Sequence, residues 1–180
     1  EEVKKNDAII PLAAIVGAPA CDLNPELATE INLNQIKNIK KLISKNQLII
    51  LPVTNSGYGI GKKDIFCDET SELNPISHYG KTKVESEKLI LDLENFVSLR
   101  LATVFGVSAR MRIDLLVDDF VYKAFNDKYI VLFESHFKRN YIHVRDIAYT
   151  FLHCIENYGE LNGEVFNVGL SDANLNKKEL

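Results

Sequence analysis

The sequence predicts an α/β fold built on a doubly wound parallel sheet. Residues 48–53 form a short, continuous apolar run, which is typical of a strand buried on both faces of a sheet. A polar, glycine-rich turn follows this run directly, and a helical pattern begins at Ser77. Residues 96–106 then repeat the order of apolar run and turn. This alternation is typical of parallel strands connected through helices.

The composition of the chain limits the classes of protein to which it can belong. At 180 residues and 46% hydrophobic content, the chain can bury a sizeable core and is one domain or slightly more. Its formal net charge of −4 provides no basic surface for nucleic acid. The longest nearly apolar stretch, residues 8–19, is too short to span a bilayer. Three scattered cysteines without metal-ligand spacing predict free thiols in a reducing cytoplasm and no metal site.

The first part of the chain predicts a strand and then a long helix. Residues 7–14 are apolar and lead into small side chains, and Pro11 suggests a strand end because proline lacks an N–H for the ladder. Residues 24–26 (Asn-Pro-Glu) are typical of a helix start, with a cap, a proline in the first turn and an acid at the positive end. Apolar side chains at helical spacing then continue as far as Ser44.

Residues 77–91 predict the helix around which the candidate site is arranged. Ser77 is a suitable N-cap, and good helix formers with an apolar side follow it. Tyr79 and Lys83 are four residues apart, so a phenol and an ammonium project from one face of this helix. A nearby ammonium favours the phenolate and lowers the pKa of the tyrosine toward working pH. The pair is therefore a candidate general base for removing a proton from an alcohol.

The spacing of Tyr79 and Lys83 is by itself a weak signal. A second pair, Tyr58 and Lys62, has the same spacing but lies among glycines, where no helix would align the two side chains. The context of the first pair makes it informative. Thr54 ends the apolar run, so its hydroxyl is expected at the carboxyl edge of the sheet, where doubly wound folds bind ligands.

The second half of the chain predicts further strands and helices. Residues 95–106 predict a buried strand with a turn, residues 114–125 a helix with one apolar side, and residues 129–133 a short strand. A helix is expected to begin at or near Asp146, and residues 163–169 predict a last strand that returns to the sheet.

Two motifs make the chain resemble the extended short-chain dehydrogenase/reductase family, the NAD-dependent sugar-nucleotide epimerases and dehydratases. In that family a strand-end Ser or Thr lies four residues before a Tyr-Gly pair, and a helix with Tyr-x-x-x-Lys follows. Here Thr54 lies four residues before Tyr58-Gly59, and Tyr79 and Lys83 follow at the same spacing. Residues 139–146 (Arg-Asn-Tyr-Ile-His-Val-Arg-Asp) are similar to the family's Arg-(Asp/Asn)-(Tyr/Phe)-Ile-His-Val-x-Asp pattern. The resemblance extends over residues 7–180.

The resemblance implies a partial Rossmann-like fold, with residues 1–106 as an incomplete NAD-binding domain whose first βαβ units are missing. Residues 107–140 would belong to a smaller substrate-binding lobe, residues 141–169 would return to the Rossmann-like domain, and residues 170–180 would begin a truncated C-terminal part of the lobe. The family's Gly-x-x-Gly-x-x-Gly fingerprint is not in this sequence. The acid that reads the ribose hydroxyl would lie in the same missing part, so the choice between NAD and NADP stays open, and we expect the 180 residues alone to bind NAD weakly.

The resemblance also implies which residues form the site. Tyr79, Lys83 and Thr54 would be catalytic, with Tyr79 as the base, Lys83 also holding the nicotinamide ribose, and Thr54 hydrogen-bonding the reacting oxygen. The residues implied to contact the cofactor are Leu12, Ala13, Ala14, Asn32, Tyr79, Lys83 and Leu101. Those implied to contact substrate are Thr54, Asn55, Ser56, Thr103, Phe133 and Arg139, whose guanidinium would bind the substrate diphosphate. From composition alone, Asn32 would be a solvated helix residue and Phe133 a core aromatic.

The implied activity is that of an NAD-dependent sugar-nucleotide epimerase, which oxidises a sugar hydroxyl transiently and returns the hydride without stereospecificity. The expected partner is a nucleoside diphosphate sugar, with no nucleic acid or membrane, and the full-length protein is expected to be a homodimer. Asn55 and Ser56 stand where dehydratases carry an Asp-Glu pair, so dehydration is less favoured. A decarboxylase, a keto-sugar reductase and a non-catalytic NAD-binding regulatory protein on the same fold stay open. The isolated chain is expected to be inactive.

Overall fold

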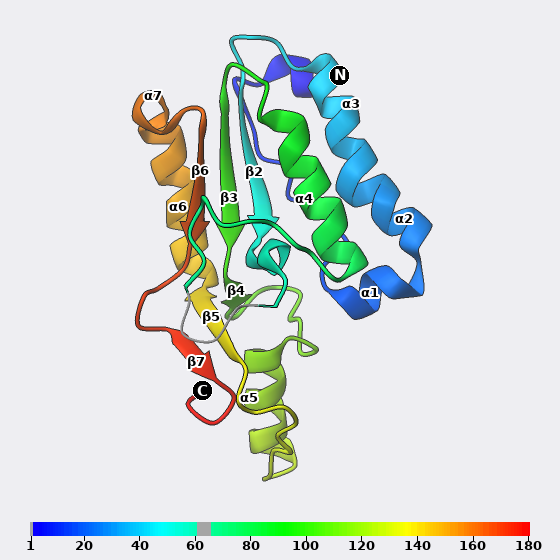
Figure 1. Cartoon of the computed structure of the whole chain (residues 1–180), viewed down its shortest axis with the longest axis vertical. Coiled ribbons are helices and arrows are strands. Elements are labelled where there is room, and N and C mark those ends of the chain that lie inside the picture. Colours follow the sequence, from blue (N-terminus) through cyan, green and yellow to red (C-terminus); the bar gives the residue numbers. More distant parts are fainter. Residues whose placement is uncertain (1, 61–65) are drawn as a thin grey trace. The chain divides into compact units, whose positions relative to one another are not determined.

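The computed structural model of the protein describes residues 2–60 and 66–180 (Figure 1). The chain divides into two compact units. Unit 1 comprises the described part of residues 1–101 together with Phe151–Asn167, and unit 2 comprises Ala102–Thr150 and Val168–Leu180. The expected return segment, residues 141–169, is shared between the units, because the strand at its start pairs within unit 2 and the strand at its end pairs within unit 1.

Unit 1 is built on a four-stranded sheet in the order β1-β2-β3-β6. Its strands are β1 (Ala8–Ile9), β2 (Leu48–Thr54), β3 (Phe96–Leu101) and β6 (Glu164–Val168). β1, β2 and β3 are parallel neighbours, and the register pairs Ala8 with Leu48 and Thr54 with Leu101. This arrangement confirms the predicted Rossmann-like parallel sheet. Every residue of β2 is buried, as its continuous apolar run indicates.

Proline inside β2 is compatible with the sheet because of where its missing N–H would point. The amide of Ile49 donates to Asn95 on the β3 side, and that of Leu48 donates to Asp7 on the β1 side. Successive backbone N–H groups of a strand point alternately to its two neighbours, so the backbone nitrogen of Pro52 faces the β1 side. β1 pairs only with Leu48 and Ile49, so Pro52 removes no bond from that ladder.

Helices that lie before and between the first three of these strands in the sequence pack beside the sheet. They are the 3-10 turn η1 (Glu2–Lys5), α1 (Ala18–Leu23), α2 (Pro25–Thr29), the π-helical turn η2 (Glu30–Asn34), α3 (Gln35–Leu42) and α4 (His78–Ile90). Figure 1 shows α4 along β2, with α2 and α3 beside it. The predicted long helix is present, but it widens at η2 in its middle. Both predicted caps form, because Asn24 accepts the Leu27 N–H at 3.0 Å and Ser77 accepts the Gly80 N–H at 3.1 Å.

The core of unit 1 lies between this sheet and these helices. Ile49, Leu51 and Val53 alternate along β2 and so project to one face of the sheet. Burial of such apolar side chains is the main favourable contribution to folding. The cluster that they join comprises Ile36, Ile39, Ile49, Leu51, Val53, Ile90 and Phe96.

Unit 2 contains a three-stranded sheet in the order β4-β5-β7. Its elements include β4 (Thr103–Phe105), α5 (Leu116–Asn126), β5 (Lys138–His143) and β7 (Asn174–Asn176). β4 and β5 are parallel, whereas β5 and β7 are antiparallel. The helix predicted for residues 114–125 is confirmed, with its start two residues later. α6 (Val144–Glu156) follows β5 directly and continues from unit 2 into unit 1, to which α7 (Tyr158–Leu161) also belongs.

The strand predicted for residues 129–133 is wrong. These residues are irregular, and Lys128 and Glu134 on either side have positive φ angles of 65° and 46°. Such angles turn the chain out of the extended conformation that a strand needs. The segment that pairs antiparallel with β5 is instead β7.

Membrane spans and metal clusters are not found in the described part of the chain. Each helix within it is too short or too polar to cross a membrane. No group of His, Cys, Asp and Glu side chains in residues 2–60 and 66–180 is arranged to hold a metal ion. The three cysteines are unpaired, with Cys21 and Cys154 buried and Cys67 exposed.

The burial of β2 can be tested at its centre. Leu51 is fully buried, so Leu51→Ala leaves a cavity in the core. We expect the free energy of unfolding to fall by about 2–5 kcal/mol, measured by urea denaturation. Leu23→Ala is the control, because Leu23 is 88% exposed and its truncation should change stability by less than about 0.5 kcal/mol. Equal losses in the two variants would contradict the position of β2 in the core.

Candidate active site

The first two turns of α4 carry the predicted tyrosine and lysine. Ser77 caps the helix, and Tyr79 and Lys83 follow about one helical turn apart. Tyr79 is half-buried, and its backbone carbonyl accepts a hydrogen bond from the Thr82 hydroxyl at 2.9 Å. The tyrosine therefore lies at the boundary of the core and not inside it.

Lys83 is a buried cation. Only 5% of the residue is exposed, and its ammonium has no hydrogen-bond or ion-pair partner among the described residues. Burial lowers the pKa of Lys83 from 10.5 to about 8, because the charged form loses its hydration. At neutral pH the side chain is still mainly protonated. Such an ammonium retains all three of its N–H donors for a ligand.

Thr54 ends β2 and caps η3 (Asn55–Tyr58), a short 3-10 turn. Its Oγ1 accepts the Ser56 N–H at 3.1 Å, and only 7% of Thr54 is exposed. Asn55 is half-buried and Ser56 is exposed. Because β2 and β3 are parallel, with Thr54 opposite Leu101, this turn lies at the carboxyl edge of the sheet.

Two glycines bring α4 and this turn into close contact. A Cβ atom at Gly80 would lie 3.2 Å from the Ser56 carbonyl oxygen. A Cβ atom at Gly57 would lie 2.9 Å from the Val84 side chain. Larger residues at either position would separate the two segments. The start of α4 and the turn after β2 are therefore packed directly on each other.

Asn32 lies in η2 and is only 2% exposed, so the solvated position expected from composition is wrong. Its side-chain oxygen accepts the Ile15 N–H at 2.8 Å, and its amide nitrogen donates to the Ile15 carbonyl at 3.0 Å. The same nitrogen lies 3.4 Å from the Thr82 hydroxyl of α4. Asn32 thereby ties the segment after β1 to the helix that carries Tyr79. Its contact with a cofactor stays a prediction.

The other predicted cofactor residues of unit 1 follow its strands. Leu12 and Ala13 are exposed beyond the end of β1, with the half-buried Ala14 next to them. Leu101 is half-buried and ends β3. Since β1, β2 and β3 are parallel neighbours, these residues and Thr54 lie at the same edge of the sheet.

Three predicted substrate residues belong to unit 2. Thr103 is half-buried on β4 opposite Tyr141, and Arg139 is exposed on β5 opposite Leu175. Phe133 lies in the irregular segment before β5 and is 73% exposed, so it is not a core aromatic. Their roles in binding substrate stay predictions.

Sequence reasoning missed a polar cluster beside the turn, which contains Tyr58, Glu87 and Arg100. Glu87 lies on α4 four residues after Lys83, and Arg100 lies inside the buried strand β3. An arginine within an apolar run is a usable signal, because a buried charge needs a partner. Of the second Tyr-x-x-x-Lys pair, Tyr58 lies in η3, and Lys62 lies outside the described residues.

Comparison with known proteins agrees with this geometry. The model of the NAD dependent epimerase/dehydratase family matches residues 1–169. The chain is similar to Agl14, a probable low-salt glycan biosynthesis reductase of Haloferax volcanii, with 28% identity over 101 residues, 56% of this chain and 34% of that protein. It is also similar to dTDP-4-dehydrorhamnose reductase of Salmonella typhimurium, with 29% identity over 86 residues, 48% of this chain and 29% of that protein.

Among solved structures, the chain is similar to UDP-glucuronic acid 4-epimerase from Bacillus cereus, determined in complex with UDP-glucuronic acid and NAD. The TM-score is 0.79 and the identity 25%, over 93% of this chain and 55% of the epimerase. The chain thus spans about half the length of this structure, and its matches cover about a third of the two curated relatives.

The buried ammonium predicts how stability depends on pH. The pKa of Lys83 is about 8 in the folded protein and near 10.5 when the chain is unfolded. Between these values the unfolded chain binds a proton that the folded protein has lost, so the free energy of unfolding rises with pH. At lower pH the folded protein holds the buried charge, and the difference between the pKa values corresponds to a destabilisation of about 3 kcal/mol.

We therefore expect Lys83→Met to be more stable than the wild type at neutral pH, by up to about 3 kcal/mol. This difference should shrink as the pH rises from about 8 to 10.5. Urea denaturation across this range measures it, with Lys81→Met on the exposed face of α4 as the control. A difference between Lys83→Met and the wild type that does not change with pH would contradict an ammonium that is buried without a partner in residues 2–60 and 66–180.

Proposed function

The chain belongs to the NAD dependent epimerase/dehydratase family, and from this membership we propose that the whole protein is an NAD-dependent sugar-nucleotide epimerase. One observation carries the proposal: the start of α4, with Tyr79 and Lys83, packs on the strand-end turn that follows Thr54. Together these segments supply a base, a cation and a hydroxyl, which are the groups needed to take a proton from an alcohol.

The three side chains have distinct parts in this proposal. Tyr79, as the phenolate, takes the proton of a sugar hydroxyl. The Lys83 ammonium lies four residues along the same helix and favours the phenolate over the phenol. Thr54 Oγ1 already accepts the Ser56 N–H, so its own proton is available to donate to the reacting oxygen.

NAD fits the residues of unit 1. The Lys83 ammonium is buried without a partner among the described residues, and ribose hydroxyls are acceptors of the kind it needs. Ala13 and Ala14 present small side chains beside the same edge, which leaves room for the cofactor near the backbone. NAD supplies, when bound, the hydride acceptor for the sugar carbon. Lys83, residues 12–14 and Leu101 would hold it, and the same set would accept NADP.

The proposed substrate is a nucleoside diphosphate sugar. Arg139 is exposed on β5, and a planar guanidinium binds two diphosphate oxygens at once. The exposed ring of Phe133 is available to stack on a base. The similar epimerase from Bacillus cereus binds UDP-glucuronic acid. We also propose that the whole protein is a homodimer, as the family resemblance implies.

A keto-sugar reductase is the second candidate, because both curated relatives are named as reductases. The same residues would serve it, with Tyr79 donating a proton to a carbonyl oxygen. An epimerase returns its cofactor to the initial state, whereas a reductase consumes one NADH for each keto sugar. Mixing the whole protein with NADH and keto sugar nucleotides, and following NADH absorbance, separates the two.

The proton-transfer role of Tyr79 can be tested by removing only its hydroxyl. In the whole protein, Tyr79→Phe should lower kcat for interconversion of sugar-nucleotide epimers by about 10²–10⁴-fold, because the base is lost. The Kd of the sugar nucleotide should change by less than about twofold, measured by calorimetry.

Tyr149→Phe is the matched control, since Tyr149 is 68% exposed on α6 and has no proposed part in the site. It should retain wild-type turnover. Turnover retained by Tyr79→Phe would refute Tyr79 as the base.

A further inference from the structure

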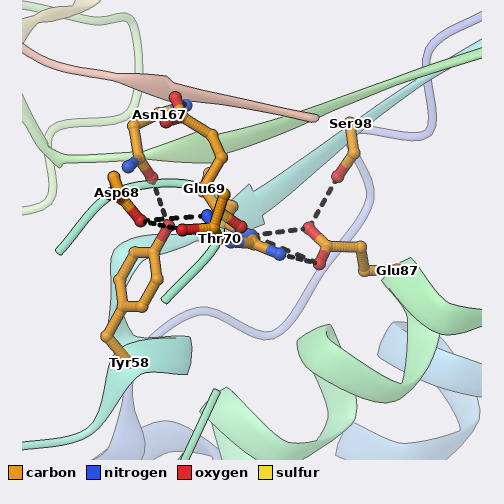
Figure 2. A network of polar contacts seen from close by, with 8 residues as sticks. Tyr58, Asp68, Glu69, Thr70, Glu87, Ser98 and Asn167 are labelled. Atoms are coloured by element: carbon orange, nitrogen blue, oxygen red, sulfur yellow. Dashed lines mark hydrogen bonds and ion pairs between the residues drawn. The ribbon is translucent and has the colours of Figure 1, made fainter. Parts of the chain in front are cut away.

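A buried polar cluster joins α4, β3 and the turn η3 (Figure 2). At its centre, Arg100 of β3 and Glu87 of α4 form an ion pair, with 2.7 Å between Nη2 and Oε1 and 3.1 Å between Nε and Oε2. Only 6% of Arg100 and 1% of Glu87 are exposed. Ser98 of β3 donates to the Glu87 carboxylate at 2.8 Å. The carboxylate is therefore held by strand β3 through two of its residues.

The rest of the Arg100 guanidinium faces the turn. Its Nη1 donates to the Tyr58 hydroxyl at 2.8 Å and to the Glu69 carbonyl at 3.1 Å. The Tyr58 hydroxyl donates in turn to Oδ1 of Asn167 on β6, at 2.7 Å. Figure 2 shows Tyr58 and Asn167 on the side of the cluster away from Glu87. Burial raises the pKa of Tyr58, although Arg100 opposes the rise, so the phenol keeps the proton that this bond requires.

The cluster connects the two segments that carry the proposed catalytic groups. Glu87 lies four residues after Lys83 on α4, and Tyr58 lies four residues after Thr54. Arg100 bonds to both Glu87 and Tyr58. A displacement of the turn from α4 would therefore have to break a bond to a buried guanidinium.

A buried ion-pair cluster contributes little net free energy to folding. Burying two charges removes their hydration, and well-packed apolar side chains of similar size are often at least as stabilising. A complete set of bonds does fix one geometry, because any other arrangement leaves a buried donor or acceptor without a partner. Burial by itself would lower the pKa of Arg100, but its hydrogen bonds to Glu87 and Tyr58 raise it, so the cation persists at all working pH values.

We propose that Arg100, Glu87 and Tyr58 are positioning residues, which hold the Thr54 turn in a fixed place against the helix that carries Tyr79 and Lys83. This inference rests on the proposed function for its effect on turnover. The Tyr58 hydroxyl bonds the turn to Arg100, and the Arg100–Glu87 pair anchors that bond on β3 and α4.

The test compares two single-hydroxyl deletions in the whole protein. Tyr58→Phe keeps the ring but removes the bonds that link the turn to Arg100 and to Asn167. Ser98→Ala removes a hydrogen bond to the same cluster from the strand side, without touching the turn. Both changes are small, and urea denaturation establishes that each variant is folded and how far its stability falls.

We expect Tyr58→Phe to lower kcat by about tenfold or more, with KM for the sugar nucleotide changed less than about twofold, because the hydroxyl of Thr54 is misplaced while binding is retained. Ser98→Ala should keep kcat within about twofold of the wild type. Amide hydrogen exchange provides a readout independent of turnover. It should become faster at residues 55–58 in Tyr58→Phe and stay unchanged there in Ser98→Ala.

Wild-type kcat and wild-type exchange at residues 55–58 in Tyr58→Phe would overturn the proposal. Equal losses of kcat in the two variants would also overturn it, since they would indicate general loosening of the unit. Failure of the proposed function is a separate result, seen as a wild-type protein without turnover on any sugar nucleotide. In that case the exchange comparison still decides whether Tyr58 holds the turn.

Discussion

The buried ion pair between Arg100 and Glu87 constrains the arrangement of unit 1. Both groups are charged and almost fully enclosed, so each must find its partners within the protein. Those partners come from a helix, a strand and a turn that are distant in sequence. The bonds are satisfied together in one packing of α4 on β2 and β3. The edge of the sheet at which Thr54 and Tyr79 lie depends on that packing.

Lys83 lowers the stability of the same unit. Its ammonium is buried without a partner in the described part of the chain, which is unfavourable for folding, and a methionine would fill the same space without that penalty. Proteins depart from the most stable solution most often at functional sites, where a ligand completes what the fold leaves unsatisfied. Arg100, whose three guanidinium nitrogens all donate hydrogen bonds, and Lys83, whose ammonium has no partner among the described residues, illustrate the two cases. The first is structural in character, and the second is suited to binding.

Local signals in the sequence predict local features well. The apolar run of β2, the caps at Asn24 and Ser77, and the helical spacing of Tyr79 and Lys83 each depend on neighbouring residues, and the structure contains all of them. Parallel pairing follows from the order of these elements. The edge of the sheet at which Thr54 lies follows from its position as the last residue of β2.

Features that depend on distant partners could not be predicted in this way. The π-helical turn at Glu30–Asn34 adds one residue to a turn, which helical spacing does not reveal, and it accompanies the burial of Asn32 against Ile15. Residues 129–133 have strand-forming side chains, but β7 takes the position beside β5. Arg100 is visible as a charge in an apolar run, yet its partners Glu87 and Tyr58 are supplied by tertiary packing.

We propose that the Tyr79 hydroxyl, the Lys83 ammonium and the Thr54 hydroxyl converge on one cleft at the carboxyl edge of the sheet. A crystal structure of the whole protein with NAD bound would show whether these three groups converge. We predict that it places all three groups around the nicotinamide, with the Lys83 ammonium within hydrogen-bonding distance of the ribose. A structure in which the Tyr79 ring is enclosed by the core, or in which Thr54 faces the opposite side of the sheet, would contradict it.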